Sequence, residues 1–269
     1  MPESPAMPEP HGFVTLIDGC RIAWRSDGPS EAPVLVLSNS LGTAMAMWDE
    51  QVAALAGSFR LLRYDTRGHG ASTAPPGDYS LDRLGRDVVE LLDGLGIEQA
   101  HFCGLSLGGM TGQWLGVHAP ERITKLVIAN SSSCMGPPDS WQQRMSVVRE
   151  QGMAAIAQAV IDRWFTPRFI ASEAPGLART HEQLLATSPQ GYAGCCAAIR
   201  DMDLRPVVHL IGRPTLVIGG SDDPATPPEH AEAIASAIAG SRLVTLDAAH
   251  LSNIEQPEAF TTALLDFLG

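Results

Sequence analysis

The stretch AHFCGLSLG at residues 100–108 decides the fold, because it predicts a short buried strand that turns directly into a helix. It contains a G-x-S-x-G motif centred on Ser106. Such a tight turn holds the serine in a strained backbone, and a side chain at Gly104 or Gly108 would clash there. The hydroxyl projects at the helix N-terminus, where the dipole favours negative charge. We therefore predict that Ser106 is a nucleophile; a glycine-rich structural turn is the alternative.

Short apolar runs recur on both sides of this stretch, several of them nearly continuous, as expected of strands buried on both faces of a parallel sheet. They lie at residues 34–38, 60–64, 124–129, 215–219 and 243–247. Helical patterns separate them, most clearly at residues 81–95, where Ser80 is a candidate N-cap. Residues 13–17 and 21–25 flank a D-G turn and predict an antiparallel hairpin. The alternation predicts an α/β fold, with a mostly parallel, doubly wound sheet after an N-terminal antiparallel hairpin.

The strand–helix alternation breaks between residues 134 and 205, where the pattern is helical throughout and proline separates several short helices. An all-helical insert between two halves of a parallel sheet is typical of a cap over the carboxyl edge of the sheet, where such folds bind their ligands. We therefore expect a core formed by residues 1–133 and 206–269 and a helical cap at residues 134–205. A purely structural excursion is the alternative.

A serine nucleophile needs a general base, and the base needs a third group to orient it. Among the eight histidines, His250 lies between the last expected strand and the last helix, which is the position and chain order this fold requires. The acid should follow the strand at residues 215–219, where two carboxylates are adjacent. We select Asp223 as the acid, with Asp222 as the alternative. The end of the preceding strand offers Asn130 instead of a carboxylate, which favours this choice.

Acyl transfer also needs backbone N–H donors for the oxyanion of the tetrahedral intermediate. The amide of Leu107, directly after the nucleophile, is one expected donor. The loop after the strand at residues 34–38 should supply the other, and Leu41 holds the position that turns an amide toward the serine. An ordinary surface turn is the alternative for this loop. The sequence thus predicts an oxyanion hole formed by Leu41 and Leu107.

Composition limits the partners of the 269-residue chain. Its formal net charge of −12 makes nucleic acid and anionic membrane surfaces poor partners. No apolar run approaches the roughly 18 residues of a membrane span. Residues 1–12 are acidic and proline-rich where a secretory signal would be basic and then apolar.

The cysteines and the motifs limit the chemistry. Five cysteines, an odd number with two of them adjacent, predict reduced thiols and a cytoplasmic protein. No H-E-x-x-H, C-x-x-C or Walker loop occurs, so we expect neither a metal nor another cofactor. The expected partner is a small molecule. The oligomeric state is left open, and a homo-oligomer is compatible with the sequence.

Several segments resemble the 3-oxoadipate enol-lactonases (β-ketoadipate enol-lactone hydrolases), which are α/β-hydrolases. The similar segments are LSNSLG at 37–42, RYDTRGHG at 63–70, FCGLSLGGM at 102–110, GCCAAIRDMD at 194–203 and DAAHLSN at 247–253. The likeness covers nearly the whole chain apart from its first dozen residues. N-S-L-G in place of a more usual H-G, and G-C-C, are its most specific features. A departure at residues 130–134 (NSSSC) bears on fine substrate preference and leaves the triad unaffected.

The resemblance implies an α/β-hydrolase fold and hydrolysis of the enol-lactone to 3-oxoadipate in the β-ketoadipate pathway, without a cofactor. Ser106, His250 and Asp223 would then form an acyl-enzyme triad. One alternative is another esterase, lactonase or C–C bond hydrolase of the same fold, and another is a non-catalytic ligand sensor that keeps the triad.

The lactone carries an acetate group, whose charge needs a cation if it is buried under the cap. Six arginines lie between residues 140 and 200: Arg144, Arg149, Arg163, Arg168, Arg179 and Arg200. Trp141 and Arg144 are three residues apart on one helix face, directly after the chain enters the expected cap. We therefore predict that Arg144 binds the carboxylate and Trp141 packs the ring. A solvated arginine and a packing tryptophan are the alternative.

Overall fold

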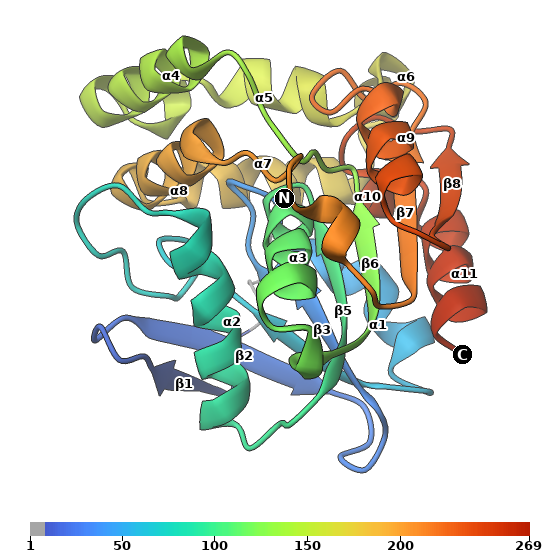
Figure 1. The fold of residues 1–269 in the computed structure, drawn as a ribbon. Helices are drawn as coiled ribbons and strands as arrows, with labels where there is room; N and C mark the ends of the chain where they lie inside the picture. Colours follow the sequence, from blue (N-terminus) through green and yellow to red (C-terminus); the bar gives the residue numbers. More distant parts are fainter. Residues whose placement is uncertain (1–8) are drawn as a thin grey trace.

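The computed structural model describes residues 9–269; residues 1–8, which belong to the acidic, proline-rich start, lie outside the described residues. Within this range the chain forms one eight-stranded sheet in the order β1-β2-β4-β3-β5-β6-β7-β8 (Figure 1). The strands are β1 (Gly12–Thr15), β2 (Arg21–Asp27), β3 (Val34–Ser38), β4 (Arg60–Tyr64), β5 (Ala100–Leu105), β6 (Ile123–Ala129), β7 (Thr215–Gly220) and β8 (Arg242–Leu246). The β1–β2 and β2–β4 pairs are antiparallel and the others are parallel. The predicted fold class is confirmed.

The strands of the N-terminal hairpin differ in length from the prediction. β1 ends at Thr15 because the turn begins earlier, with the amide of Gly19 donating to the carbonyl of Leu16 at 2.9 Å. β2 continues to Asp27 because its second half pairs with β4, where Asp27 lies opposite Leu61. Turn and strand-pairing hydrogen bonds therefore set where β1 and β2 end, and the alternation of residue types alone does not predict these bonds.

Helices cover both faces of the sheet, with α2, α3 and α9 on one face and α1 and α11 on the other (Figure 1). Their bounds are α1 (Asp49–Leu55), α2 (Leu81–Gly94), α3 (Leu107–His118), α9 (Pro228–Ala237), α10 (Ser252–Glu255) and α11 (Pro257–Leu268). α2 begins as predicted, because the Ser80 hydroxyl accepts a hydrogen bond from the amide of Arg83 at 3.1 Å. Across residues 9–269, no helix combines the length and apolar character needed to cross a bilayer.

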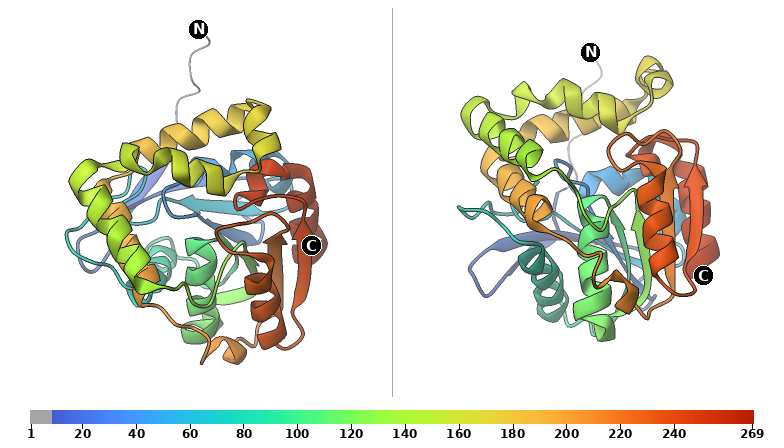
Figure 2. Two further views of the ribbon diagram at one scale, coloured as in Figure 1. Left: turned by 90° about the horizontal axis from the view of Figure 1, so that it is seen from above. Right: turned by 45° about the horizontal axis from the view of Figure 1, so that its top comes forward.

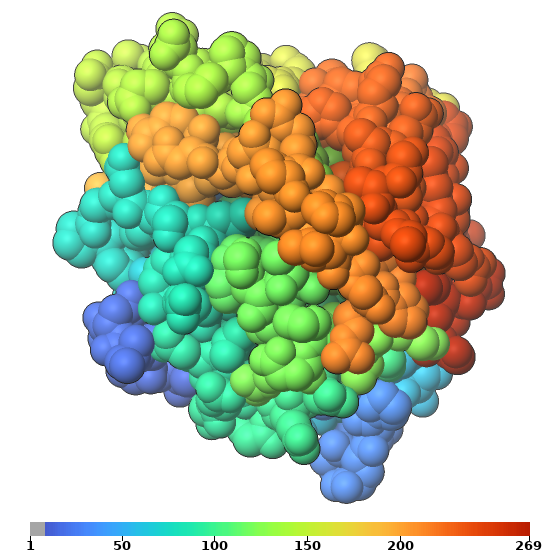
Figure 3. Space-filling view, viewed as in Figure 1, coloured from blue at the N-terminus to red at the C-terminus, as the bar shows by residue number. Residues whose placement is uncertain are grey.

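Five further helices lie beyond the ends of β6, β7 and β8 (Figures 1 and 2). These cap helices are α4 (Pro138–Gln151), α5 (Ala157–Trp164), α6 (Pro167–Ala171), α7 (Pro175–Ala186) and α8 (Pro189–Asp201). The chain enters and leaves them at one place, since Cys134 and Asp203 form an antiparallel bridge. From α8 the chain runs down between α3 and α9 and returns to the sheet (orange, Figure 3).

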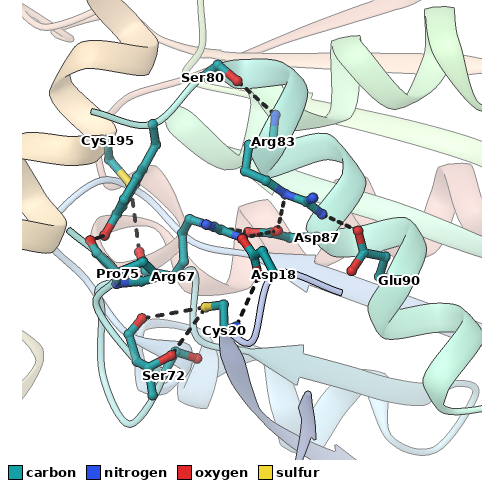
Figure 4. Close-up of polar contacts among 12 residues, drawn as sticks. Asp18, Cys20, Arg67, Ser72, Pro75, Ser80, Arg83, Asp87, Glu90 and Cys195 are labelled. Atoms are coloured by element: carbon teal, nitrogen blue, oxygen red, sulfur yellow. Dashed lines mark hydrogen bonds and ion pairs between the residues drawn. The ribbon is translucent and has the colours of Figure 1, made fainter. Parts of the chain in front are cut away.

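A buried arginine anchors the loop between β4 and α2 (Figure 4). Arg67 contacts Asp87 of α2 through Nε at 2.5 Å and Nη2 at 2.6 Å, and Asp18 of the hairpin turn at 2.9 Å. Arg83 adds a second contact to Asp87 at 2.8 Å. Removal of either Arg67 or Asp87 would take one partner from a buried ion pair and leave the other with a single, more exposed partner, Asp18 or Arg83, which is destabilising. The network therefore fixes the RGHG loop, which borders the candidate site.

Candidate active site

Ser106 occupies the turn between β5 and α3, with φ 58° and ψ −114°. Positive φ is uncommon for a residue with a side chain and is maintained only where the surroundings enforce it. A Cβ on Gly104 would lie 2.1 Å from the carbonyl oxygen of Gly108, and one on Gly108 would lie 2.2 Å from that of Ser38. The two glycines therefore allow the strand, the helix and β3 to approach closely enough to form this turn.

Asp223 follows β7 and His250 follows β8, so the two residues lie at the carboxyl ends of neighbouring strands. His250 Nδ1 is 2.8 Å from Asp223 Oδ2, and both side chains are buried. Asp222, the alternative acid, is exposed and accepts a hydrogen bond from the hydroxyl of Ser221. Of the two adjacent carboxylates, only Asp223 is in position to orient the histidine.

The Asp223 carboxylate is held as an anion by several donors besides His250. Oδ2 accepts from Thr226 Oγ1 at 2.8 Å and from Asn130 Nδ2 at 3.0 Å, while Oδ1 accepts from the amides of Ala225 and Thr226. Burial acts to raise the pKa of Asp223, but the charge of His250 and these hydrogen bonds outweigh it and hold the pKa at about 2. The ionised acid requires the proton on His250 Nδ1, which leaves Nε2 free to act as a base.

One pocket brings most of the predicted residues together. Ser106, His250, Leu41, Trp141 and Arg144 all line it. Asp223 joins them through its hydrogen bond to His250, and Leu107 follows the serine directly. No predicted site residue lies elsewhere, although the roles assigned to them stay predictions. In the described part of the chain, no three His, Cys, Asp or Glu side chains are grouped as metal ligands.

The two expected oxyanion donors lie on the elbow and on the loop that packs against it. The amide of Gly108 donates to the carbonyl of Asn39 at 3.0 Å, which ties the loop after β3 to the start of α3. Between residues 9 and 269, no acceptor takes the amide hydrogens of Leu41 and Leu107. Both amides therefore lack an acceptor among these residues; Leu41 lines the pocket, and Leu107 directly follows Ser106, which also lines it.

His69 holds this loop in place, a role that the sequence did not indicate. The amide of Gly42 donates to His69 Nε2 at 2.9 Å, so the proton is on Nδ1, which donates to the carbonyl of Arg67 at 3.2 Å. Burial lowers the pKa of His69 to about 4, which keeps the imidazole neutral and able to accept. The RGHG segment of the resemblance was the available signal, but it does not reveal which residue the histidine contacts.

Four of the six arginines in the cap helices are committed to carboxylates outside the pocket. These pairs join Arg149 to Asp78, Arg168 to Asp247, Arg179 to Glu50 and Arg200 to Asp201. The other two, Arg144 and Arg163, have no carboxylate partner among residues 9–269, and both line the pocket. The prediction named Arg144 of this pair, and its role stays a prediction; Arg163 was among the six arginines considered but was not selected.

Arg144 and Arg163 come from different helices, α4 and α5, and lie close enough to influence each other. Partial burial lowers the pKa of Arg163, and the positive charge of Arg144 lowers it further. The Arg144 guanidinium also lies over the ring of Trp141, with its carbon 4.8 Å from the ring centroid. An anion bound between the two guanidinium groups would relieve their repulsion.

Comparison with known proteins agrees with this geometry. The family model for the alpha/beta hydrolase fold matches residues 33–257. The chain therefore belongs to the α/β-hydrolase fold family, and the predicted class of enzyme, a hydrolase of this family, is confirmed.

Within the family, the predicted resemblance to the enol-lactonases is confirmed. The chain is 45% identical to 3-oxoadipate enol-lactonase 2 of Acinetobacter baylyi, over 88% of this chain and 89% of the relative. An enol-lactonase structure from Burkholderia xenovorans LB400 matches with a TM-score of 0.93 and 45% identity, over 95% of this chain and 99% of that one. The structure of a hydrolase from Pseudomonas aeruginosa PA01 matches with a TM-score of 0.94 and 51% identity, over 96% and 98%.

Proposed function

We propose that this protein hydrolyses 3-oxoadipate enol-lactone to 3-oxoadipate through an acyl-enzyme on Ser106. The observation that best supports this substrate is that Arg144 and Arg163, which have no carboxylate partner among residues 9–269, line the pocket that also contains Ser106 and His250. An ester pocket with two cations suits a lactone that bears a carboxylate. The similarity to proteins named 3-oxoadipate enol-lactonase supports the same substrate.

In the proposed mechanism, His250 Nε2 takes the Ser106 proton as the serine oxygen attacks the lactone carbonyl. The amides of Leu41 and Leu107 donate to the oxyanion. Collapse of the intermediate breaks the ring C–O bond, and the enolate leaving group takes the proton from His250 and ketonises. A water molecule activated by His250 then attacks the acyl-enzyme and releases the product. Asp223 holds the imidazole tautomer and stabilises its cation.

In this proposal the core carries out the chemistry and the cap helices bind the substrate carboxylate. Residues 1–133 and 206–269 supply the triad and the oxyanion donors, and the helical cap, residues 134–205, supplies the carboxylate site. A chain with net charge −12 offers no diffuse positive field to an anionic substrate, so local cations are needed. Trp141 keeps the Arg144 guanidinium over the pocket, and two arginines can bind a carboxylate through parallel hydrogen bonds.

No cofactor is required. A cytoplasmic location and a homo-oligomeric state stay open predictions.

Arg144→Ala and Arg163→Ala test the carboxylate site. Each variant should lower kcat/KM for the enol-lactone by roughly 2–5 kcal/mol in transition-state free energy, about 30- to 4,000-fold, because a desolvated charge pair is lost. Hydrolysis of the neutral ester p-nitrophenyl acetate should be nearly unchanged. Arg149→Ala is the matched control, since Arg149 lies on the same helix as Arg144 but pairs with Asp78 outside the pocket.

An equal loss of kcat/KM on both substrates would show damage to the cap helices. An unchanged kcat/KM on both substrates would show that neither arginine binds the substrate. A panel of other lactones, simple esters and C–C ring-cleavage products separates the proposed function from the other hydrolases of this fold. Ligand binding without turnover of any of them would favour a sensor.

A further inference from the structure

A buried hydroxyl without a partner lies in the same pocket as the nucleophile. Ser40 is 3% exposed, lines the pocket with Ser106 and His250, and its Oγ forms no hydrogen bond with any of residues 9–269. Burying a polar group without a partner is costly, so such a group calls for an explanation. In the described part of the chain, three other residues have unpartnered buried side-chain atoms, and none of them lines this pocket. The pocket that Ser40 lines is the place from which an acceptor can approach this hydroxyl.

Several contacts hold the backbone around Ser40 in place beside the pocket. Its carbonyl accepts from both the amide and the hydroxyl of Thr43, at 3.2 and 2.8 Å. Its amide approaches Met47 Sδ at 3.3 Å. Two residues further on, the Gly42 amide is held by His69. Two donors of this loop that take no acceptor among residues 9–269 are consecutive: the hydroxyl of Ser40 and the amide of Leu41.

We propose that the Ser40 hydroxyl is a third donor to the oxyanion that forms when Ser106 attacks an ester carbonyl. The inference rests on the proposed acyl transfer at Ser106. A donor next to the reacting oxygen interacts more strongly with the oxyanion than with the ground-state carbonyl, so its contribution appears in kcat rather than in binding. The unpaired hydroxyl of the free enzyme is the cost of having this donor in position before substrate arrives.

Ser40→Ala should lower kcat about 30- to 300-fold, with little change in KM, as for the loss of one oxyanion donor. The loss should be similar for the enol-lactone and p-nitrophenyl acetate, because every ester forms the oxyanion. Ser40→Thr, which keeps a hydroxyl, should recover at least about tenfold of it. The melting temperature of Ser40→Ala should be unchanged or higher, since the substitution breaks no hydrogen bond with any of residues 9–269.

Ser72→Ala is the matched control at a buried serine outside the pocket. The Ser72 hydroxyl accepts from the amide of Ala23 at 2.9 Å and donates to the carbonyl of Asp65 at 2.6 Å. This variant should show a lower melting temperature with unchanged kcat, the opposite pattern to Ser40→Ala.

An unchanged kcat for Ser40→Ala on both substrates would overturn the proposal, and so would a loss confined to KM or one accompanied by a fall in melting temperature. If the wild-type protein hydrolyses p-nitrophenyl acetate but not the enol-lactone, the proposed substrate is wrong, and the ester assay still decides the role of Ser40. If it hydrolyses neither, the acyl transfer and the role of Ser40 are both wrong.

Discussion

Replacing Ser106 by alanine is expected to lower turnover of the enol-lactone by on the order of 10⁵–10⁶, and His250→Ala by a similar factor. Without the serine oxygen no acyl-enzyme forms. Without the imidazole the serine remains a weak nucleophile at its ordinary pKa. The members of a triad act as a unit, so the double variant should lose little more than either single one. Steady-state kinetics at saturating substrate measures the three effects.

These losses must come from chemistry and not from unfolding. The elbow owes its shape to the close approach of Gly104 to Gly108 and of Gly108 to β3, which an alanine at position 106 leaves intact. The Ser106→Ala protein should therefore keep its melting temperature and still bind 3-oxoadipate. A folded Ser106→Ala variant that retains more than about 1% of wild-type turnover would rule out this serine as the nucleophile.

Asp223→Asn is expected to lower kcat by about 10⁴, somewhat less than loss of the serine. An asparagine amide facing His250 Nδ1 would donate to it, which forces the proton onto Nε2 and removes the base that Ser106 needs. Oδ2 also accepts from Asn130 and Thr226, so one orientation of the new amide places donors against donors. The measurement is kcat for the enol-lactone near neutral pH, with the melting temperature recorded in parallel.

Asp222→Asn is the matched control for the acid. Asp222 has the same side chain one position earlier but is exposed and does not contact His250. Its substitution should change kcat little. If Asp222→Asn were the more damaging of the two, the assignment of the acid would be wrong.

The sequence predicts the parts of this site that depend on local geometry. The G-x-S-x-G turn needs glycine at both ends, and the buried strands read as continuous apolar runs, so the elbow and the parallel sheet follow from neighbouring residues. His250 and Asp223 follow from their places after the last two strands, because parallel strands bring their carboxyl ends to one edge. Chain order and strand position were enough for these residues.

The features that were missed depend on contacts between distant segments. The six arginines of the cap helices cannot be told apart by residue type. Which of them face the pocket depends on the rotation of each helix and on nearby carboxylates, such as Asp78 and Glu50, that pair with the others. Arg163 could not be separated from the others on spacing. The role of His69 depends on the contact between its ring and the amide of Gly42, and the role proposed for Ser40 depends on the lack of a partner for its hydroxyl among the described residues.

The central claim is that the enol-lactone is opened by Ser106 through a covalent acyl-enzyme. Rapid acid quenching of the enzyme during its first turnover, followed by peptide mass spectrometry, tests this most directly. We expect an adduct on the peptide that contains Ser106, with the mass of the intact lactone, because ring opening releases no fragment. The adduct should appear before the product and be absent from Ser106→Ala. Product formation without any adduct, or with the adduct on another residue, would contradict the mechanism.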